Sequence, residues 1–273
     1  GCGSITVMSV AQLVVMAGGF ATRAELVRAT SRGEVDRALA AGEIVADGRG
    51  RYAMPATDVA IRAAHALSGV LGLTSAALHH GWEVLHEPQQ PQVVVPRRRR
   101  VPAAKRVGVS VRYADLFPDQ ITDGIATGVE TTLLHCLTRL PRADALAVAD
   151  SALRHGVPPA TLRRVALCAQ GPGARQARWV AEHADGDAAN PFESGLRDIC
   201  LDVPGLRVQA QRIVSTGRLD ARPDLVDVDL RIIIEADSFA WHGGRADLAR
   251  DARRYNLMVV GDWLVLRFSW EDV

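Results

Sequence analysis

The chain has 273 residues, of which 48% are hydrophobic, so it can bury a sizeable core and form two or three domains. No window approaches the eighteen or more consecutive apolar residues of a membrane span, and the start lacks the pattern of a secretory signal. The net charge is only +1, so the chain as a whole lacks the basic composition of a typical nucleic-acid binder. These features predict a soluble cytoplasmic protein.

The charges are distributed unevenly along the chain. Residues 190–273 hold 11 Arg against 14 acidic residues, a net of −3, whereas residues 1–189 carry a net of +4. An anionic partner is therefore attracted more strongly to the amino-terminal part. The excess of acidic residues in the last third suggests that some of them have a specific role. Cys136, Cys168 and Cys200 form no C-x-x-C pattern, which is typical of a reducing compartment and predicts three small core residues.

Residues 8–55 have the pattern of three short helices followed by a β-hairpin. The second and third helices begin with capping pairs, Thr22 with Glu25 and Ser31 with Glu34, and a D-G/R-G turn then separates two strands. This order describes a winged helix, whose third helix can enter the major groove of DNA. A winged helix that contacts protein instead is the alternative. The arginines expected to contact phosphates or bases are Arg32, Arg37, Arg49 and Arg51.

Residues 56–187 predict a mixed α/β domain. A helix-rich stretch precedes two strands, PQVVVP and GVSVRYADL, and several helices follow. The run Arg97–Arg100 between these strands is expected to form a solvated, basic hairpin tip, and phosphate binding, with Arg97 and Arg98 as the contacts, is the alternative.

Residues 190–273 predict a third domain with a mixed sheet. Asn190, Pro191 and Glu193 are typical of a capped helix start, and three strand-like pieces, a helix and a closing strand follow. The order α, β, β, β, α, β predicts a sheet with helices packed on it, so the whole chain is expected to be α/β, or α+β overall.

The strand IIIEAD brings carboxylates to one face of this sheet. Because side chains alternate along a strand, Glu235 and Asp237 share a face, and Asp224, predicted to end the preceding strand, could lie beside Glu235 in a hairpin register. Neighbouring acids raise one another's pKa, and a divalent cation relieves their repulsion. The segment offers too few His or Cys residues for softer metals, so it predicts Mg²⁺, or Mn²⁺.

The motifs of this last third resemble the PD-(D/E)xK nuclease superfamily, in the branch related to very-short-patch-repair endonucleases. The resemblance is carried by the closing segment WLVLRFSWEDV and by Glu193, Gln211, Pro223, Asp224, Glu235, Ala236, Asp237 and His242. The resemblance implies a restriction-endonuclease-like fold and a divalent-metal-dependent DNA endonuclease, in repair or defence. It also implies that Asp224 and Glu235 bind the metal and that Glu193, Gln211, Asp237 and His242 complete the catalytic site.

One position departs from the superfamily pattern, and it decides between activity and binding. Asp237 stands where most members have a lysine, so His242 would have to act as general base or position the water. Arg250, Arg253 and Arg254 follow at helical spacing as candidate phosphate contacts, with a solvated helix face paired to acidic neighbours as the alternative.

The first two thirds resemble AbiEi-type antitoxins of type IV toxin–antitoxin systems. The resemblance rests on the winged helix, on TSAALHHGW and on GVETTLLHCL, and it implies promoter binding and a cognate toxin as partner. A DNA-binding endonuclease is therefore one hypothesis. An antitoxin or transcriptional repressor, whose inactive nuclease-like domain serves binding or homodimer formation, is the other. A protein-interaction module without nucleic-acid contact is a third.

Overall fold

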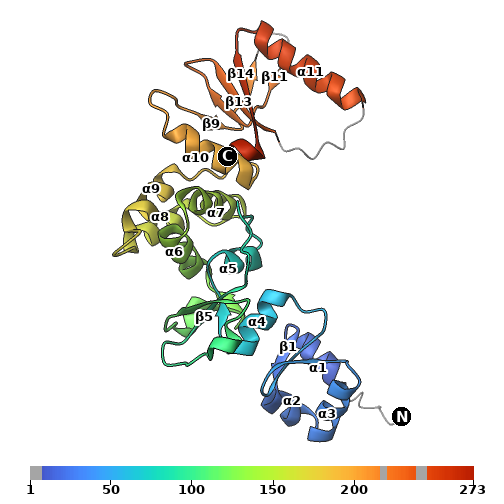
Figure 1. Ribbon diagram of the computed structural model, residues 1–273. Coiled ribbons are helices and arrows are strands. Elements are labelled where there is room, and N and C mark those ends of the chain that lie inside the picture. Colours follow the sequence, from blue (N-terminus) through green and yellow to red (C-terminus); the bar gives the residue numbers. More distant parts are fainter. Residues whose placement is uncertain (1–7, 216–219, 238–244) are drawn as a thin grey trace, which may run out of the picture. The chain divides into compact units, whose positions relative to one another are not determined.

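The computed structural model describes residues 8–215, 220–237 and 245–273, and of residues 245–251 it describes the backbone alone. The chain is mixed α/β, with helices and several sheets (Figure 1). Within the described residues, no helix is long and apolar enough to cross a membrane.

The chain divides into two compact units. Unit 1 comprises Gly1–His79 and Pro88–Val129, and unit 2 comprises His80–Glu87 and Glu130–Val273. This division crosses the predicted middle domain, residues 56–187, and the three predicted domains stay a prediction.

The first part of unit 1 contains three short helices and a three-stranded antiparallel sheet of order β1-β3-β2. Its elements are α1 (Val10–Met16), β1 (Phe20–Thr22), α2 (Arg23–Ala29), α3 (Arg32–Ala40), β2 (Val45–Gly48) and β3 (Arg51–Ala53). The predicted caps are confirmed, since Thr22 and Glu25 form a capping box and the Ser31 side chain accepts a hydrogen bond from the Glu34 amide. Buried Val14, Leu26 and Val35, one from each helix, join the three helices in a small core.

The second part of unit 1 is built on a five-stranded sheet of order β6-β5-β4-β8-β7. Its elements are α4 (Val59–Leu67), β4 (Val70–Leu71), α5 (Leu73–His79), β5 (Gln92–Val95), η1 (Ala103–Lys105), β6 (Ser110–Tyr113), η2 (Pro118–Gln120), β7 (Ile121–Thr122) and β8 (Ala126–Thr127). Helix α4 packs on this sheet through Ala64 and Leu67, beside Leu71 and Val93.

The segment between β5 and β6 differs from the predicted hairpin. Strands β5 and β6 are parallel neighbours, with Gln92 opposite Ser110 and Val95 opposite Tyr113. Two parallel neighbours need a crossover connection, so the run Arg97–Arg100 begins a long exposed crossover and is not a hairpin tip. The prediction failed because alternation identifies strands but not their relative direction.

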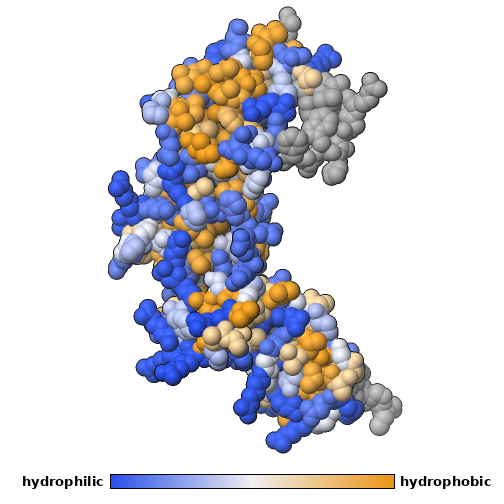
Figure 2. Space-filling model, viewed as in Figure 1, coloured by the Kyte–Doolittle hydropathy of each residue, from blue (hydrophilic) through white to orange (hydrophobic). Residues whose placement is uncertain are grey.

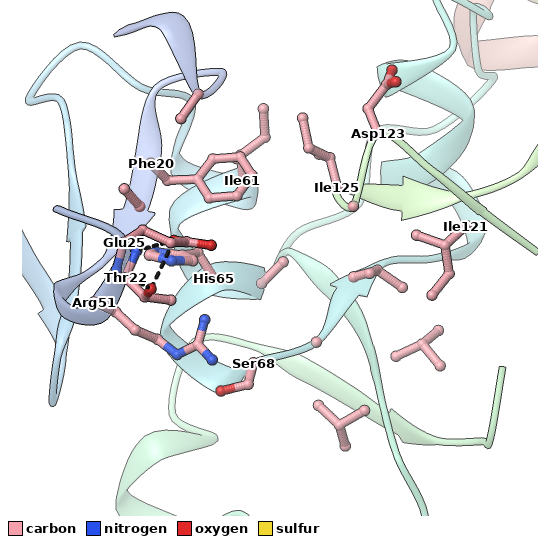
Figure 3. Close-up of a pocket in the computed structure, with 18 of the residues that line it drawn as sticks. Phe20, Thr22, Glu25, Arg51, Ile61, His65, Ser68, Ile121, Asp123 and Ile125 are labelled. Atoms are coloured by element: carbon pink, nitrogen blue, oxygen red, sulfur yellow. Dashed lines mark hydrogen bonds between the residues drawn. The ribbon is translucent and has the colours of Figure 1, made fainter. Parts of the chain in front are cut away.

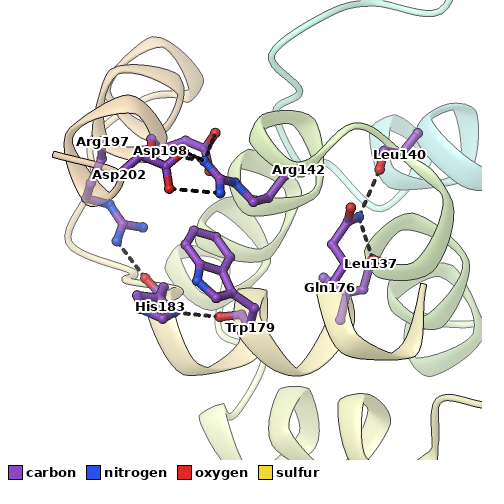
Figure 4. Close-up of polar contacts among 9 residues, drawn as sticks. All are labelled: Leu137, Leu140, Arg142, Gln176, Trp179, His183, Arg197, Asp198 and Asp202. Atoms are coloured by element: carbon purple, nitrogen blue, oxygen red, sulfur yellow. Dashed lines mark hydrogen bonds and ion pairs between the residues drawn. The ribbon is translucent and has the colours of Figure 1, made fainter. Parts of the chain in front are cut away.

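Unit 2 contains a group of helices that ends with α10. These helices are α6 (Val129–Arg139), α7 (Arg142–Arg154), α8 (Pro159–Cys168), α9 (Ala174–His183) and α10 (Pro191–Leu201). Arg142 of α7 pairs with Asp198 (2.7 Å) and Asp202 (2.6 Å) of α10, and its guanidinium lies 4.5 Å from the centre of the Trp179 ring (Figure 4).

A buried ion pair adds a second link between α7 and α10. Arg197 of α10 donates to the Asp150 carboxylate of α7 at 2.6 Å, and both side chains are nearly inaccessible to solvent. Arg197 also donates to the backbone oxygen of His183 at 2.6 Å, which ties in the end of α9 (Figure 4). Buried charges require such pairing, so these contacts fix the helix that carries Glu193.

The rest of unit 2 is a mixed sheet covered by two helices. Its elements are β9 (Gln209–Ala210), β10 (Val214–Ser215), β11 (Asp220–Ala221), β12 (Leu225–Asp227), β13 (Ile232–Asp237), α11 (Arg245–Val260), β14 (Leu264–Ser269) and η3 (Trp270–Asp272). The four-stranded sheet has the order β14-β13-β12-β9, in which only β13 and β14 are parallel, and β10 pairs with β11 apart from it.

The predicted alternation along β13 is confirmed. Ile234 packs with Leu196 of α10, and Ile233 packs with Met258 of α11, so one helix covers each face of the sheet. Strand β14 forms one edge and exposes Leu264 and Leu266, where Figure 2 shows an apolar surface over these strands.

The described cysteines are free, and only two lie in the core. Cys136 and Cys200 are buried, and burial raises the pKa of both thiols, that of Cys200 to about 11. Cys168 is exposed at the end of α8, so the prediction of three core cysteines was wrong at this position.

Candidate functional site

A cluster of polar side chains lies between α10 and the sheet of unit 2. Glu193 is 2% exposed at the start of α10, where Asn190 caps the helix by accepting a hydrogen bond from the Glu193 amide at 3.0 Å. The Glu193 carboxylate accepts hydrogen bonds from the Asn190 side chain at 2.7 Å and the Ala189 amide at 2.9 Å. The predicted helix cap is therefore confirmed, and the same contacts orient a buried carboxylate toward the sheet.

The hairpin register brings Asp224 beside Glu235. Leu225 pairs with Ile234, so the preceding residue, Asp224, continues the ladder opposite Glu235. The Asp224 carboxylate accepts a hydrogen bond from the Ala236 amide at 2.8 Å. Asp224 lies just before β12, not at the end of a strand as predicted, because the strand begins at Leu225.

Gln211 connects the carboxylate on the helix with the one on the sheet. Its side-chain Nε2 donates to Glu193 at 3.0 Å and to Asp224 at 3.2 Å, while its amide donates to the Asp224 backbone oxygen at 2.9 Å. Gln211 has φ of 55°, in the left-handed region that residues other than glycine rarely adopt and that costs on the order of 1 kcal/mol. Strain of this kind is typical of residues held for function.

Burial raises the pKa of both glutamates in the cluster. Glu235 is 4% exposed, and burial together with the neighbouring Asp224 raises its pKa to about 8. Burial raises the pKa of Glu193 as well, with a further contribution from Asp224. Repulsion between Asp224 and the two glutamates therefore destabilises their ionised forms, and a bound cation could offset it.

Two arginines, one from α11 and one from β14, partly compensate these acids. Arg254 of α11 donates to Glu235 at 2.7 Å. The side chains of Asp247 and Asp251, the acids on its own helix, lie outside the described residues, and its phosphate contact stays a prediction. Arg267 of β14 pairs with Asp237 at 2.6 Å and lies 4.3 Å from the centre of the Tyr255 ring. Asp237, where the nuclease pattern predicted a lysine, is thus itself paired with an arginine.

The sequence patterns did not point to Arg267 or Tyr255. Burial raises the pKa of Tyr255 to about 12, with Glu235 as a further cause. The lone arginine within the apolar closing strand LVLRFS was a signal in the sequence. Its partner, Asp237, could not be predicted, because the contact depends on the parallel register in which Arg267 lies opposite Glu235. His242 lies outside the described residues, as do the side chain of Arg250 and any contact it makes, whereas Arg253 is exposed.

The cluster offers a hard cation two carboxylates. Within the described part of the chain, no group of three or more His, Cys, Asp or Glu side chains is arranged to hold a metal ion. Mg²⁺ commonly takes one or two protein carboxylates and completes its shell with water and phosphate oxygens. Asp224 and Glu235 fit this requirement through their adjacency and oxygen donors, although Arg254 would have to release Glu235.

The arginines predicted for DNA contact lie in unit 1, mostly exposed. Arg32 and Arg37 are exposed on α3, and Arg49 is exposed in the turn between β2 and β3, whereas Arg51 is half-buried. Burial lowers the pKa of Arg51, and the nearby positive charge of Arg99 lowers it further.

The crossover after β5 adds a second group of arginines to this unit. Arg97 and Arg98 are exposed in a turn, and the Arg97 amide donates to Asp115 at 3.0 Å. A depression of about 580 Å³ is lined by Arg97, Arg99, Arg100 and Arg106 together with Tyr113, which is 39% exposed. Four guanidinium groups beside an exposed aromatic ring form a surface that attracts phosphates and can stack on a base.

Similarities to known proteins cover parts of the chain. Two proteins of Mycobacterium tuberculosis, the uncharacterized proteins MT2308 and Rv2248, are each 29% identical over 161 residues. The match spans 56% of this chain and 58% of each relative. The crystal structure of the RV2827C protein from the same species is similar at a TM-score of 0.40 and 15% identity, over 75% of this chain and 86% of that one.

A family model gives a more specific result. Residues 67–181, which extend from the end of α4 into α9, match the AbiEi antitoxin C-terminal domain. The match supports the predicted resemblance of the middle segment. It ends before residues 190–273, and the resemblance of that segment to nucleases stays a prediction. Residues 67–181 of this chain therefore match an AbiEi antitoxin domain.

Proposed function

We propose that the chain is a DNA-binding protein of the antitoxin type that represses transcription from its own promoter. The observation that carries this proposal is the group of arginines around Tyr113, in a segment that matches an antitoxin family. In this proposal, residues 8–55 act as a winged helix whose third helix, α3, enters the major groove. The turn between β2 and β3 and the crossover after β5 add phosphate contacts.

The electrostatics of unit 1 support this division of roles. Arg99 lies close enough to Arg51 to lower its pKa, so the arginines of the β2–β3 hairpin and of the crossover act on the same region. Like charges held together are costly in water and become favourable against a polyanion. Phosphate contacts of this kind provide affinity and orientation, whereas base contacts from α3 would provide sequence selectivity.

A mobility-shift titration with the promoter of its own gene tests this proposal. We expect tighter binding to the promoter than to a scrambled duplex of equal length, with an affinity that falls steeply as salt increases. Binding that is equal for both duplexes, or insensitive to salt, would contradict the proposal. A cognate toxin is the expected protein partner, and co-purification with the product of the adjacent gene tests that point.

A second function is favoured by the carboxylate cluster. Gln211 links Glu193 to Asp224, and Asp224 lies beside Glu235; this grouping of acids supports a divalent-metal-dependent DNA endonuclease acting in repair or defence. When bound, Mg²⁺ or Mn²⁺ would lower the pKa of a water and offset charge on the leaving oxygen. Asp224 and Glu235 would hold the metal, and Gln211 would keep Asp224 in position. Arg254, once released from Glu235, could contact a phosphate. A role for His242 in positioning the water stays a prediction.

Incubation of the protein with supercoiled DNA and Mn²⁺ separates the two proposals. Nicking that is lost in Glu235→Ala and retained in Glu271→Ala, a substitution of an exposed acid, would support the endonuclease. Nicking that survives Glu235→Ala would rule it out. Promoter binding without nicking would leave repression as the function, with unit 2 used for binding or homodimer formation. The exposed edge strand β14 favours the homodimer, which sedimentation velocity would detect.

A further inference from the structure

A cavity within unit 1 is separate from the basic depression and from the carboxylate cluster. It has a volume of about 610 Å³ and is lined by parts of α1, α2, α4, β5 and the loop before β8. This volume lies within the range of roughly 300 to 1,000 Å³ that is typical of small-molecule sites. The resemblances considered above give this cavity no role.

The lining is apolar over most of its area, with most of its polar groups at one end and the exposed Asp123 beside Ile125 (Figure 3). Figure 3 shows Ile121 and Ile125 on one side and the polar group of Thr22, Glu25, Arg51 and His65 on the other. A cavity with an apolar body and a few convergent polar groups selects amphipathic ligands, because each part of the ligand meets its own kind of surface.

The polar end carries one cation in need of a partner. Within the described residues, the half-buried Arg51 guanidinium makes no hydrogen bond or ion pair. The Glu25 carboxylate is already engaged, since it accepts hydrogen bonds at 2.7 Å from both the amide and the hydroxyl of Thr22. Burial is the first cause that lowers the pKa of Arg51, and the repulsion from Arg99 exceeds the attraction of Glu25. The end of the cavity is therefore positive and short of acceptors.

His65 does not add a second cation there. It is 7% exposed, its ring centre lies 4.8 Å from that of Phe20, and its Nδ1 lies 3.8 Å from Asp47. Burial and the neighbouring Arg51 lower the pKa of His65, so it is a neutral, flat wall of the cavity at physiological pH.

We propose that this cavity binds an amphipathic monocarboxylate, with its carboxylate on Arg51 and its apolar body along the isoleucine-lined side. The planar guanidinium offers a two-point hydrogen bond to a carboxylate, which a hydroxyl cannot match. A neutral ligand of the same shape would fill the apolar part and leave Arg51 unpaired. A cationic ligand would be repelled. This inference does not depend on the proposed binding of DNA.

Calorimetric titration of the full chain with decanoate, decanol and decylamine, below the concentrations at which they form micelles, tests the proposal. We expect decanoate to bind at one site and at least about tenfold more tightly than decanol, the factor that one charge-assisted hydrogen bond provides. Decylamine is expected to bind more weakly than decanol. The absence of decanoate binding, or equal affinity for decanoate and decanol, would overturn the proposal.

Variants identify the site. Arg51→Gln is expected to weaken decanoate binding about tenfold and to leave decanol binding unchanged, and Arg51→Lys should recover part of the loss. Arg28→Gln removes the same charge from an exposed position outside the cavity and should leave the affinity for both ligands unchanged.

A second kind of variant fills the cavity. Ala17→Trp places a bulky ring at the cavity from an exposed helix end, so folding is preserved while both ligands lose affinity. Unchanged decanoate binding in both Arg51→Gln and Ala17→Trp would refute the assignment.

Discussion

The two units use most of their charges in different ways. Unit 1 exposes most of its arginines, and Arg97, Arg98 and Arg32 project into solvent. Unit 2 instead buries charged residues in its interior. Among the described residues, the acidic and arginine residues that are buried as a whole lie there, namely Asp150, Glu193, Arg197, Asp198, Asp227 and Glu235, whereas in unit 1 the buried Asp47 side chain pairs with the partly exposed Arg62 at 2.8 Å. Exposed charges cost little to keep and act on partners, whereas buried charges require internal counterions and control the stability of the unit.

Loss of a buried counterion should have the largest effect. Arg197→Ala leaves the Asp150 carboxylate, which is 0% exposed, without its ion pair, and we expect a loss of about 3–5 kcal/mol in the free energy of unfolding. Chemical denaturation monitored by circular dichroism measures this loss. The control is Arg164→Ala, which breaks an exposed pair with Glu130 and should cost at most about 1 kcal/mol. Equal losses in the two variants would remove the distinction between buried and exposed charges.

The carboxylate cluster should make stability depend on pH. The pKa of Glu235 is raised to about 8 in the folded state, so the folded chain binds a proton that the unfolded chain releases above about pH 4.5. The contribution of Glu235 is therefore fully present below pH 4.5 and is lost as pH rises toward 8, which amounts to about 2–4 kcal/mol after allowance for the coupling to Asp224.

Glu235→Gln should abolish that part of the pH dependence and stabilise the protein at pH 8, because glutamine resembles the protonated acid. Thermal melting at pH 5 and pH 8 without divalent ions checks this, with Glu271→Gln as the exposed control. Mn²⁺ at pH 8 should raise the melting temperature of the unsubstituted protein and not of Glu235→Gln. A variant that keeps the full pH dependence would show that Glu235 is not the titrating group.

Exposed arginines should affect binding without affecting stability. Arg97→Gln combined with Arg98→Gln is expected to weaken promoter binding about ten- to hundredfold and to reduce the slope of log affinity against log salt by about 2. The melting temperature should stay within about 1 °C, because both side chains are exposed. Fluorescence anisotropy over a salt series measures the slope. A lower melting temperature with unchanged DNA affinity would reverse the roles assigned to these charges.

The smallest effect is expected where a charge of unit 1 is half-buried. Arg51 belongs to the cavity and lies near Arg99 of the basic surface, so a carboxylate bound to it should lower the local positive potential. We expect saturating decanoate to weaken promoter binding about two- to fivefold, within the coupling range of allosteric ligands. Decanol is the control and should have no effect. An unchanged DNA affinity, with decanoate shown to be bound, would separate the cavity from the DNA-binding surface.

Local signals in the sequence were sufficient for much of the fold. The caps at Thr22, Ser31 and Asn190 lie where the pattern predicted them, because a cap involves groups only three residues apart. The alternation of Ile232 to Asp237 likewise predicted which residues face each helix. The adjacency of Asp224 and Glu235 followed from one hairpin register. The parallel pairing of β5 and β6 and the exposure of Cys168 did not follow, because they depend on contacts far apart in the chain.

By itself, the sequence determined the caps, the helical and strand periodicities, and the candidate acids at the end of an isoleucine strand. Only the tertiary structure decided which charges meet. Arg254 and Arg267 reach Glu235 and Asp237 from elements 19 and 30 residues away, through helix packing and a parallel register. The cavity around Arg51 likewise joins segments from α1 to the loop before β8. The spacing of apolar residues in the sequence indicates whether each residue is buried. Which distant residues form ion pairs depends on how the helices and strands pack.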